Sequence, residues 1–402
     1  MISTEIKLKN ILNQKEKDRV LEIFKDAFID NIHTSNTNHG FFSGYKNSYP
    51  NFVLLYHGND LIGAAVAALR NVNLLNGSVK SITVGPIAID PPFQRKGYSN
   101  YLMQGLNMLA QKLNATIIYL IGRNSFYSRH DYYPCLARSK VVVEIDDIDE
   151  HDNVIIQPYN KKYLDEMKSM YEKLASQNTF TSCRNDNDWN WLTKYGINTY
   201  YFYKPQLIIS GNKLIGYFTK DPREKTRIRE AIYDTGEKNI RRFLYGMKKY
   251  SIDNNLVKFE IMTPIDSPLY RYLKKFKNTK FIQFIPDNVG QLMKILNVSK
   301  LFEELKNYFY RKNSLIKYEY SFSLFIDDER ISFSKNNGKF KMSNDVYDDA
   351  VLIPKEYFPG FITGYYYDKI FRNLNFNNIQ NKLAMELFFE KSVPFVYQGD
   401  NY

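Results

Sequence analysis

The 402-residue chain has only two cysteines, five histidines and two tryptophans. Cys135 and Cys183 cannot form a disulfide framework and lack the spacing of a metal site, so a reduced compartment fits best. The N-terminal segment has no apolar signal core, and the longest apolar run, Leu61 to Leu69, is too short to span a bilayer. These absences predict a soluble cytoplasmic protein without a metal and without a membrane partner.

Positive charge is in excess: 55 Lys and Arg stand against 43 Asp and Glu, a net charge of +12. Such an excess can indicate nucleic-acid binding. Here the basic residues are spread along the chain among many Asn, Tyr, Phe and Ile residues, so we prefer a solvated basic surface and expect no nucleic-acid partner. The length exceeds that of a usual single domain and predicts two or three domains.

The stretch from Val84 to Pro134 is the most informative part of the sequence. An apolar segment, a turn with Gly97, an amphipathic segment, a second apolar segment and an aromatic cluster follow one another. This order predicts a strand, a phosphate-binding loop, a helix and a strand. The helix places leucines 102, 106, 109 and 113 on one face. Its start offers unpaired N–H groups and a partial positive charge, which suit a pyrophosphate.

Weaker signals organise the rest of the chain. Before the central stretch we expect a strand, a helix and three strands, over residues 5–8, 16–31, 52–57, 61–69 and 79–89. Residues 151 to about 285 repeat this organisation, with a hairpin at Gly211-Asn212, but carry no comparable glycine loop between strand and helix. From Pro286 we expect an amphipathic helix over 289–309, a three-stranded meander between 318 and 343, and two terminal helices.

Residues Gln94 to Ser99 resemble motif A of the GNAT acetyltransferases, written (Arg/Gln)-x-x-Gly-x-(Gly/Ala). Gln94 and Gly97 match it, Ser99 stands where a third small residue is usual, and Arg95 stands where many members carry glycine. The resemblance implies that backbone amides hold the pyrophosphate of acetyl-CoA. The residues it implies for this site are Ile87, Ala88, Ile89, Gln94, Arg95, Lys96, Gly97, Tyr98, Ser99 and Asn100.

The layout of the whole chain resembles the enhanced intracellular survival (Eis) acetyltransferases. The fold class implied is α/β (α+β), with tandem GNAT-like mixed-sheet domains. Residues 1–150 would hold acetyl-CoA, residues 151–285 would form a second GNAT-like domain without a CoA motif, and residues 286–402 would resemble sterol carrier proteins and deliver the C-terminus to the active site. The resemblance also implies an aminoglycoside acceptor and a homo-oligomer, possibly a hexamer.

The same resemblance implies the catalytic groups. The family carries a Tyr-Gly-Arg-Phe-Gly-Tyr type segment whose first tyrosine is the general acid, and residues 127–132 occupy those places. Tyr127 is thus the matched acid, while His130 and Asp131 depart from the aromatic and the glycine. The carboxylate of Tyr402 is the matched base. The connection after the first helix would border the acceptor, with the candidate residues Asp26, Asp30, Phe41 and Phe42.

Elementary chemistry agrees with these roles and leaves alternatives. An amine that arrives as an ammonium must lose a proton before it attacks a thioester, and the expelled thiolate must be protonated or stabilised. The alternatives are a protein-lysine or polyamine acetyltransferase, and a protein that binds CoA or an apolar ligand without turnover. His130 is either a second base or a turn residue, and we favour the turn. We also expect Cys135 to be a small buried residue. Trp189 and Trp191 are expected to form an interface or a structural anchor and not a substrate platform.

Overall fold

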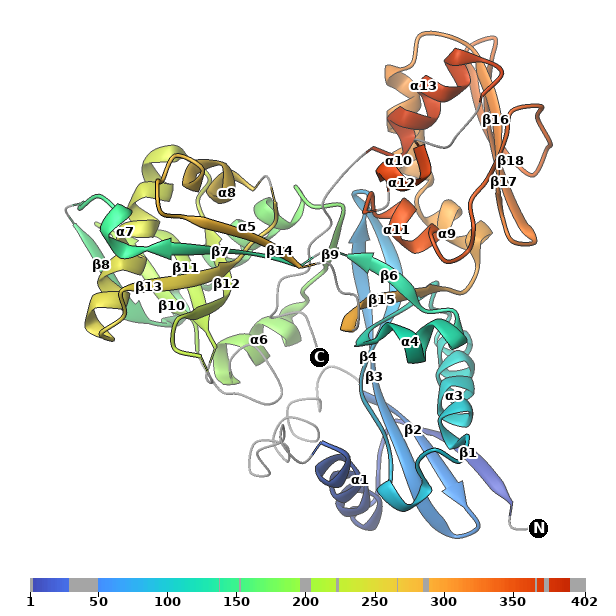
Figure 1. The fold of residues 1–402 in the computed structure, drawn as a ribbon, viewed down its shortest axis with the longest axis horizontal. Coiled ribbons are helices and arrows are strands. Elements are labelled where there is room, and N and C mark those ends of the chain that lie inside the picture. Colours follow the sequence, from blue (N-terminus) through green and yellow to red (C-terminus); the bar gives the residue numbers. More distant parts are fainter. Residues whose placement is uncertain are drawn as a thin grey trace. The chain divides into compact units, whose positions relative to one another are not determined.

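The computed structural model describes residues 3–28, 50–136, 138–151, 153–195, 204–221, 224–265, 267–284, 289–365, 367–371 and 376–390 (Figure 1). They fall into two compact units. The first is drawn from Met1–Asn13, Pro50–Leu136 and Pro286–Pro394, and the second from Gln14–Tyr49, Ala137–Ile285 and Phe395–Tyr402. None of the helices in these ranges is long and apolar enough to cross a membrane.

A mixed sheet forms the base of the first unit, with the strand order β1-β2-β3-β4-β5-β15-β6. Neighbouring strands are antiparallel except β4 and β5, which are parallel and are joined through the helix α3. The elements are β1 (Thr4–Lys9), β2 (Pro50–His57), β3 (Asp60–Leu74), β4 (Gly77–Ile89), α3 (Tyr98–Lys112), β5 (Ile117–Arg123), β6 (Tyr133–Leu136) and β15 (Val289–Ile295). The strand and helix predictions for this part of the chain are confirmed.

The helix α3 covers one face of this sheet, as Figure 1 shows. Leu102, Leu106 and Leu109 are buried, at 0–2% exposure, and share a core with strand residues such as Val53 and Ile118. At about 1.5–3 kcal/mol for each buried leucine, these contacts fix the helix on the sheet. The leucine spacing in the sequence therefore predicts the buried face correctly.

Two boundaries differ from the sequence prediction. Residues 289–295 form the strand β15 between β5 and β6, where one amphipathic helix over 289–309 was expected. Helices follow only at α9 (Val298–Glu304) and α10 (Lys306–Leu315). The strand β7 (Arg138–Glu144) pairs with strands of the second unit, so the change between sheets falls near residue 137 and not at 150.

The second unit is built on a seven-stranded sheet with the order β14-β7-β13-β12-β11-β10-β8. Its parallel pair, β12 and β13, is joined through the helix α7. Residues 234–236 connect β12 to α7 directly, so this unit has no counterpart of the loop before α3. Its other elements are α1 (Gln14–Ala27), β8 (Val154–Pro158), α5 (Leu164–Ala175), β9 (Phe180–Ser182), α6 (Asp186–Tyr195), β10 (Gln206–Ser210), β11 (Lys213–Lys220), β12 (Arg227–Tyr233), α7 (Glu237–Asp253), β13 (Lys258–Met262), α8 (Pro268–Leu273) and β14 (Lys280–Phe284).

A buried ion pair explains the tryptophan segment of this unit. Arg184 forms a bidentate pair with Glu230, at 3.0 and 2.5 Å, and the side chains are 3% and 0% exposed. The guanidinium lies 3.9 Å from the centroid of the Tyr171 ring and 5.2 Å from that of Trp189. Trp189 is 2% exposed, so the expectation of a structural anchor is confirmed.

The remainder of the first unit is a four-stranded sheet, in the order β18-β17-β16-β19, with helices beside it (orange to red in Figure 1). The predicted three-stranded meander is confirmed. Phenylalanine rings of β16, β17 and the helices fill its core, with Phe322, Phe333 and Phe388 buried against one another. The elements are β16 (Tyr320–Ile326), β17 (Glu329–Asn336), β18 (Lys339–Ser343), β19 (Ala350–Leu352), α11 (Phe358–Ile362), α12 (Tyr367–Phe371) and α13 (Ile379–Phe388).

Candidate functional site

The strands β4 and β5 separate at their carboxyl ends. They pair only from Ser81 with Ile117 to Val84 with Leu120. Beyond this point β4 continues to Ile89 paired with β3 alone, and β5 continues to Arg123 paired with β15 alone. The two strands therefore leave a wedge between them, where backbone groups of both edges lack a partner strand and can meet a ligand.

A bulge in β4 marks the start of this wedge. Ala65 pairs with Ile87 and Ala67 pairs with Val84, so a single residue of β3 faces both Gly85 and Pro86. Bulges of this kind bend a strand and re-aim its neighbours, and they are frequent beside active sites. The predicted contact residues Ile87, Ala88 and Ile89 lie on the bent part of β4, paired with β3.

The loop between β4 and α3 contains two left-handed residues. Gly97 has a φ of +82, and Arg95 has a φ of +61. The left-handed conformation costs a non-glycine residue about 1–2 kcal/mol, so glycine would be unstrained at the Arg95 position. Successive N–H groups in such a loop converge into an anion-binding concavity. Gln94 supports it by donating from Nε2 to the Ile89 carbonyl at 2.9 Å.

The start of α3 completes this loop. Gly97 is its N-cap and supplies no side-chain hydrogen bond, so the first N–H groups of the helix remain available to a ligand. The side chains of Arg95 and Lys96 are exposed beside it. Tyr98 is anchored at the other side, because its hydroxyl lies 3.2 Å from Nδ1 of His57. The predicted acetyl-CoA residues thus follow one another on the end of β4, the loop and the start of α3.

Tyr127 lies at the splayed end of β5. It ends the short helix α4 (Asn124–Tyr127), and its ring rests directly on Gly122 of β5. A Cβ atom at Gly122 would lie 2.0 Å from Cε2 of the Tyr127 ring, so only glycine leaves room for this ring. Burial raises the pKa of Tyr127 to about 12. The hydroxyl is therefore protonated at neutral pH and is available as a donor. No local pattern in the sequence indicates this role of Gly122.

The residues after Tyr127 form a compact turn, with the 3-10 helix η4 over Ser128–His130. The Tyr132 N–H donates to the Tyr127 carbonyl at 3.2 Å, and Arg129 Nε donates to the Ser125 carbonyl at 3.1 Å. His130 lies in this turn, as expected, and its alternative role as a second base stays a hypothesis. Asp131 has a φ of +66, a left-handed conformation that glycine adopts without strain.

Several predicted residues lie outside the described part of the chain. They are Tyr402, Asp30, Phe41 and Phe42, so their proposed roles stay predictions. Asp26 lies near the end of α1 with an exposed side chain. Cys135 is fully buried, as expected, and burial raises the pKa of its thiol well above the ordinary value. A thiol in this state is a poor nucleophile at neutral pH.

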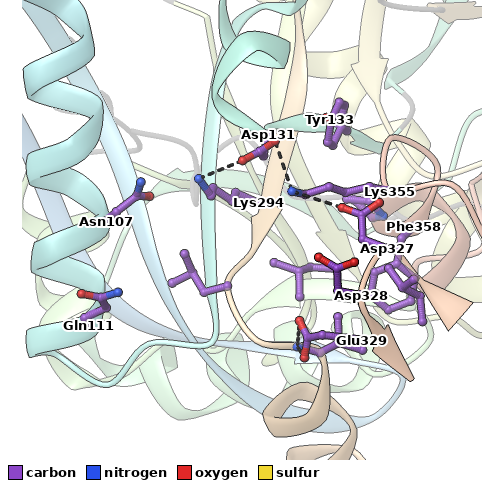
Figure 2. Close-up of a pocket in the computed structure, with 15 residues that line it drawn as sticks. Asn107, Gln111, Asp131, Tyr133, Lys294, Asp327, Asp328, Glu329, Lys355 and Phe358 are labelled. Carbon is purple, nitrogen blue, oxygen red and sulfur yellow. Dashed lines mark hydrogen bonds and ion pairs between the residues drawn. The ribbon is translucent and has the colours of Figure 1, made fainter. Parts of the chain in front are cut away.

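A cavity of about 370 Å³ lies elsewhere in the first unit, between α3, β15 and the C-terminal part (Figure 2). Its polar lining includes Asn107 and Gln111 of α3, Lys294 of β15 and Lys355. None of the predicted acetyl-CoA residues lines it. This cavity is thus distinct from the wedge between β4 and β5.

Comparison with known proteins agrees with this geometry. The family model of the acetyltransferase (GNAT) domain matches residues 10–135. The matched residues include the wedge, the loop, α3 and the Tyr127 turn. No curated protein matches the sequence of the chain. The chain therefore carries a GNAT acetyltransferase domain, and the class of protein that this domain defines is the N-acetyltransferases.

Solved structures extend the fold similarity to the whole chain. A GCN5-related N-acetyltransferase from Anabaena variabilis shares 14% identity at a TM-score of 0.74, over 99% of this chain and 100% of that one. One from Kribbella flavida shares 10% identity at a TM-score of 0.71, over 99% of both chains. Eis1 from Mycobacterium abscessus shares 12% identity at a TM-score of 0.66, over 99% of this chain and 100% of Eis1. At these identities the likeness shows a common fold, and the fold is Eis-like throughout.

Proposed function

We propose that this N-acetyltransferase transfers acetyl from acetyl-CoA to a primary amine of a small, polyamine-type acceptor, with an aminoglycoside as the first candidate. The choice of an aminoglycoside as acceptor rests on the resemblance of the sequence to the Eis acetyltransferases. One observation above all supports the proposed site. The Tyr127 ring packs on Gly122 beside the ends of β4 and β5, where these strands separate.

The loop before α3 supports the binding of the co-substrate. Two left-handed residues, Arg95 and Gly97, and an uncapped helix start present N–H donors to an anion. The pyrophosphate of acetyl-CoA supplies such an anion, and the exposed cations of Arg95 and Lys96 add to the attraction. The thioester would then extend along the bent part of β4 into the wedge, where free backbone N–H groups can polarise its carbonyl.

Direct transfer removes two protons from the acceptor nitrogen. The ammonium gives up the first proton, and the nitrogen then attacks the thioester carbonyl. The nitrogen loses its second proton as the carbon–sulfur bond breaks and the CoA thiolate leaves. We assign the first proton to the Tyr402 carboxylate, following the family pattern. Asp26, exposed near the end of α1, is our candidate for contact with a second ammonium of the acceptor. No covalent bond between enzyme and acetyl group is needed.

The raised pKa of Tyr127 refines its role as the acid. A thiol has a pKa of roughly 8.5, so full proton transfer from a hydroxyl whose pKa is about 12 would be uphill by about 5 kcal/mol. We therefore propose that Tyr127 first donates a hydrogen bond to the sulfur as negative charge develops there. The Tyr127 proton follows only as solvent, or the second proton of the acceptor nitrogen, replaces it on the tyrosine oxygen.

Replacing Tyr127 with Phe tests this assignment. The substitution keeps the ring on Gly122 and removes only the donor, so kcat should fall about 100-fold or more, a usual effect for an acid, while binding of CoA persists. Thiol release gives the rate, and calorimetric titration with CoA gives the affinity. An unchanged rate would contradict the role of Tyr127. Binding of CoA by the wild type without turnover of any amine would favour a binding protein instead.

A further inference from the structure

Lys294 joins the strand β15 to the turn that carries Tyr127. Its Nζ donates to the His130 carbonyl at 3.1 Å and lies 3.4 Å from Oδ2 of Asp131. It also lies 5.8 Å from the centroid of the Tyr132 ring. The side chain is only 15% exposed. One partly buried ammonium therefore contacts three consecutive residues of the turn.

The turn needs such support because its own hydrogen bonds are few. Asp131 is held in the left-handed region, at φ +66, a conformation that strains a non-glycine residue. The Asp131 N–H donates to the Ser128 carbonyl, and the Tyr132 N–H donates to the Tyr127 carbonyl, each at 3.2 Å. Lys294 pairs with the carboxylate of Asp131, the residue that stands where the Eis segment carries glycine.

The 127–132 turn also fixes the position of the Tyr127 ring. Tyr132, at 1% exposure, packs its ring edge against that of Tyr127, with 5.9 Å between centroids. Its hydroxyl has no hydrogen-bond partner among the described residues, so packing alone holds this ring. A shift of residues 130–132 would therefore move Tyr132, and Tyr127 with it.

A second lysine provides a matched comparison. Figure 2 shows Asp131 between Lys294 and Lys355 at the edge of the cavity. Lys355 Nζ lies 3.3 Å from Oδ1 of Asp131 and 3.4 Å from Asp327, and its side chain is 41% exposed. It thus pairs with the same carboxylate, but no contact joins it to the His130 carbonyl in the described structure.

We infer that Lys294 is a positioning residue for Tyr127: it holds the 127–132 turn through the His130 carbonyl, the Asp131 carboxylate and the Tyr132 ring. The inference rests on the proposed role of Tyr127. It adds that a strand more than 160 residues away in the sequence sets the geometry of this hydroxyl.

A double-mutant cycle tests the inference. Lys294→Met should lower kcat about tenfold, a coupling common for residues in contact, and leave the KM for acetyl-CoA unchanged. Lys355→Met should lower kcat less than about twofold, as expected for an exposed ion pair. In the Tyr127→Phe background, Lys294→Met should have no further effect on kcat, because the group that it positions is gone. Lys294→Arg, which keeps the charge and the donor, should retain most of the rate.

Hydrogen exchange supplies a readout that does not depend on activity. The Tyr132 amide should exchange faster in Lys294→Met than in the wild type and in Lys355→Met. The inference is overturned by equal losses of kcat for Lys294→Met in both backgrounds, by losses of equal size in the two lysine variants, or by unchanged exchange at Tyr132. A Tyr127→Phe protein of full activity would instead overturn the role of Tyr127, and the exchange experiment would still decide whether Lys294 holds the turn.

Discussion

The contact between Gly122 and Tyr127 gives the sharpest prediction. In Gly122→Ala the new Cβ would lie 2.0 Å from Cε2 and 2.6 Å from Cδ2 of the tyrosine ring. Carbon atoms in contact are about 3.5 Å apart, so the ring must move by about 1.5 Å. A displacement of about 1 Å can cost about 100-fold in rate, and we expect a loss of kcat of this size. The substitution does not touch the loop before α3, our proposed site for acetyl-CoA, so the KM for acetyl-CoA should change little.

Gly105→Ala is the matched control. Its Cβ would lie 2.4 Å from Cγ1 of Val53, an equally severe clash in the core between α3 and the sheet, away from Tyr127. Both substitutions should lower stability by about 1–3 kcal/mol, because each overpacks a filled site. Thermal unfolding measures this loss, and steady-state thiol release measures kcat and KM. Equal kcat in the two folded variants would refute the reasoning.

Three further predictions concern the loop, the second unit and pH. In Gly97→Ala the new Cβ meets no atom within 4 Å, but the residue is strained at φ +82. Calorimetry should therefore show that acetyl-CoA binds several-fold more weakly, while kcat stays unchanged. The control Gly211→Ala, at φ +60 and also without a clash, should leave binding of acetyl-CoA unaltered. Glu230→Gln removes the carboxylate charge that faces the buried Arg184 guanidinium, and chemical denaturation should show about 3–5 kcal/mol less stability. Burial and neighbouring cations lower the pKa of His130, so the unfolded chain takes up its proton first and stability should fall as pH falls below about 6.5; His130→Gln should reduce the drop in Tm between pH 7 and pH 5.

Local patterns in the sequence predict much of the first unit. The leucine spacing identifies α3 and its buried face because the period of a helix is local information. The glycine loop likewise predicts a turn just before the helix, and Gly97 lies there as the N-cap of α3, with φ +82. Packing of a helix onto a sheet through one apolar stripe then follows from the hydrophobic effect.

Features that depend on distant pairing could not be predicted in this way. Residues 289–295 contain apolar and polar side chains that suit either a helix or a strand, and their partners in β5 lie over 160 residues earlier in the sequence. The same distance separates Lys294 from His130 and Asp131. Gly122 gives no local sign that a tyrosine ring rests on it, since the contact arises only when α4 folds back over β5.

The most direct test of the proposed function is acetyl-CoA-dependent thiol release with aminoglycosides, polyamines and lysine peptides, using protein with an untagged C-terminus and its Tyr127→Phe variant. We predict turnover with aminoglycosides and a loss of about 100-fold in the variant at unchanged CoA affinity. Turnover with lysine peptides or polyamines alone would move the acceptor to that class. The absence of turnover with every amine, with CoA still bound, would contradict the proposed function.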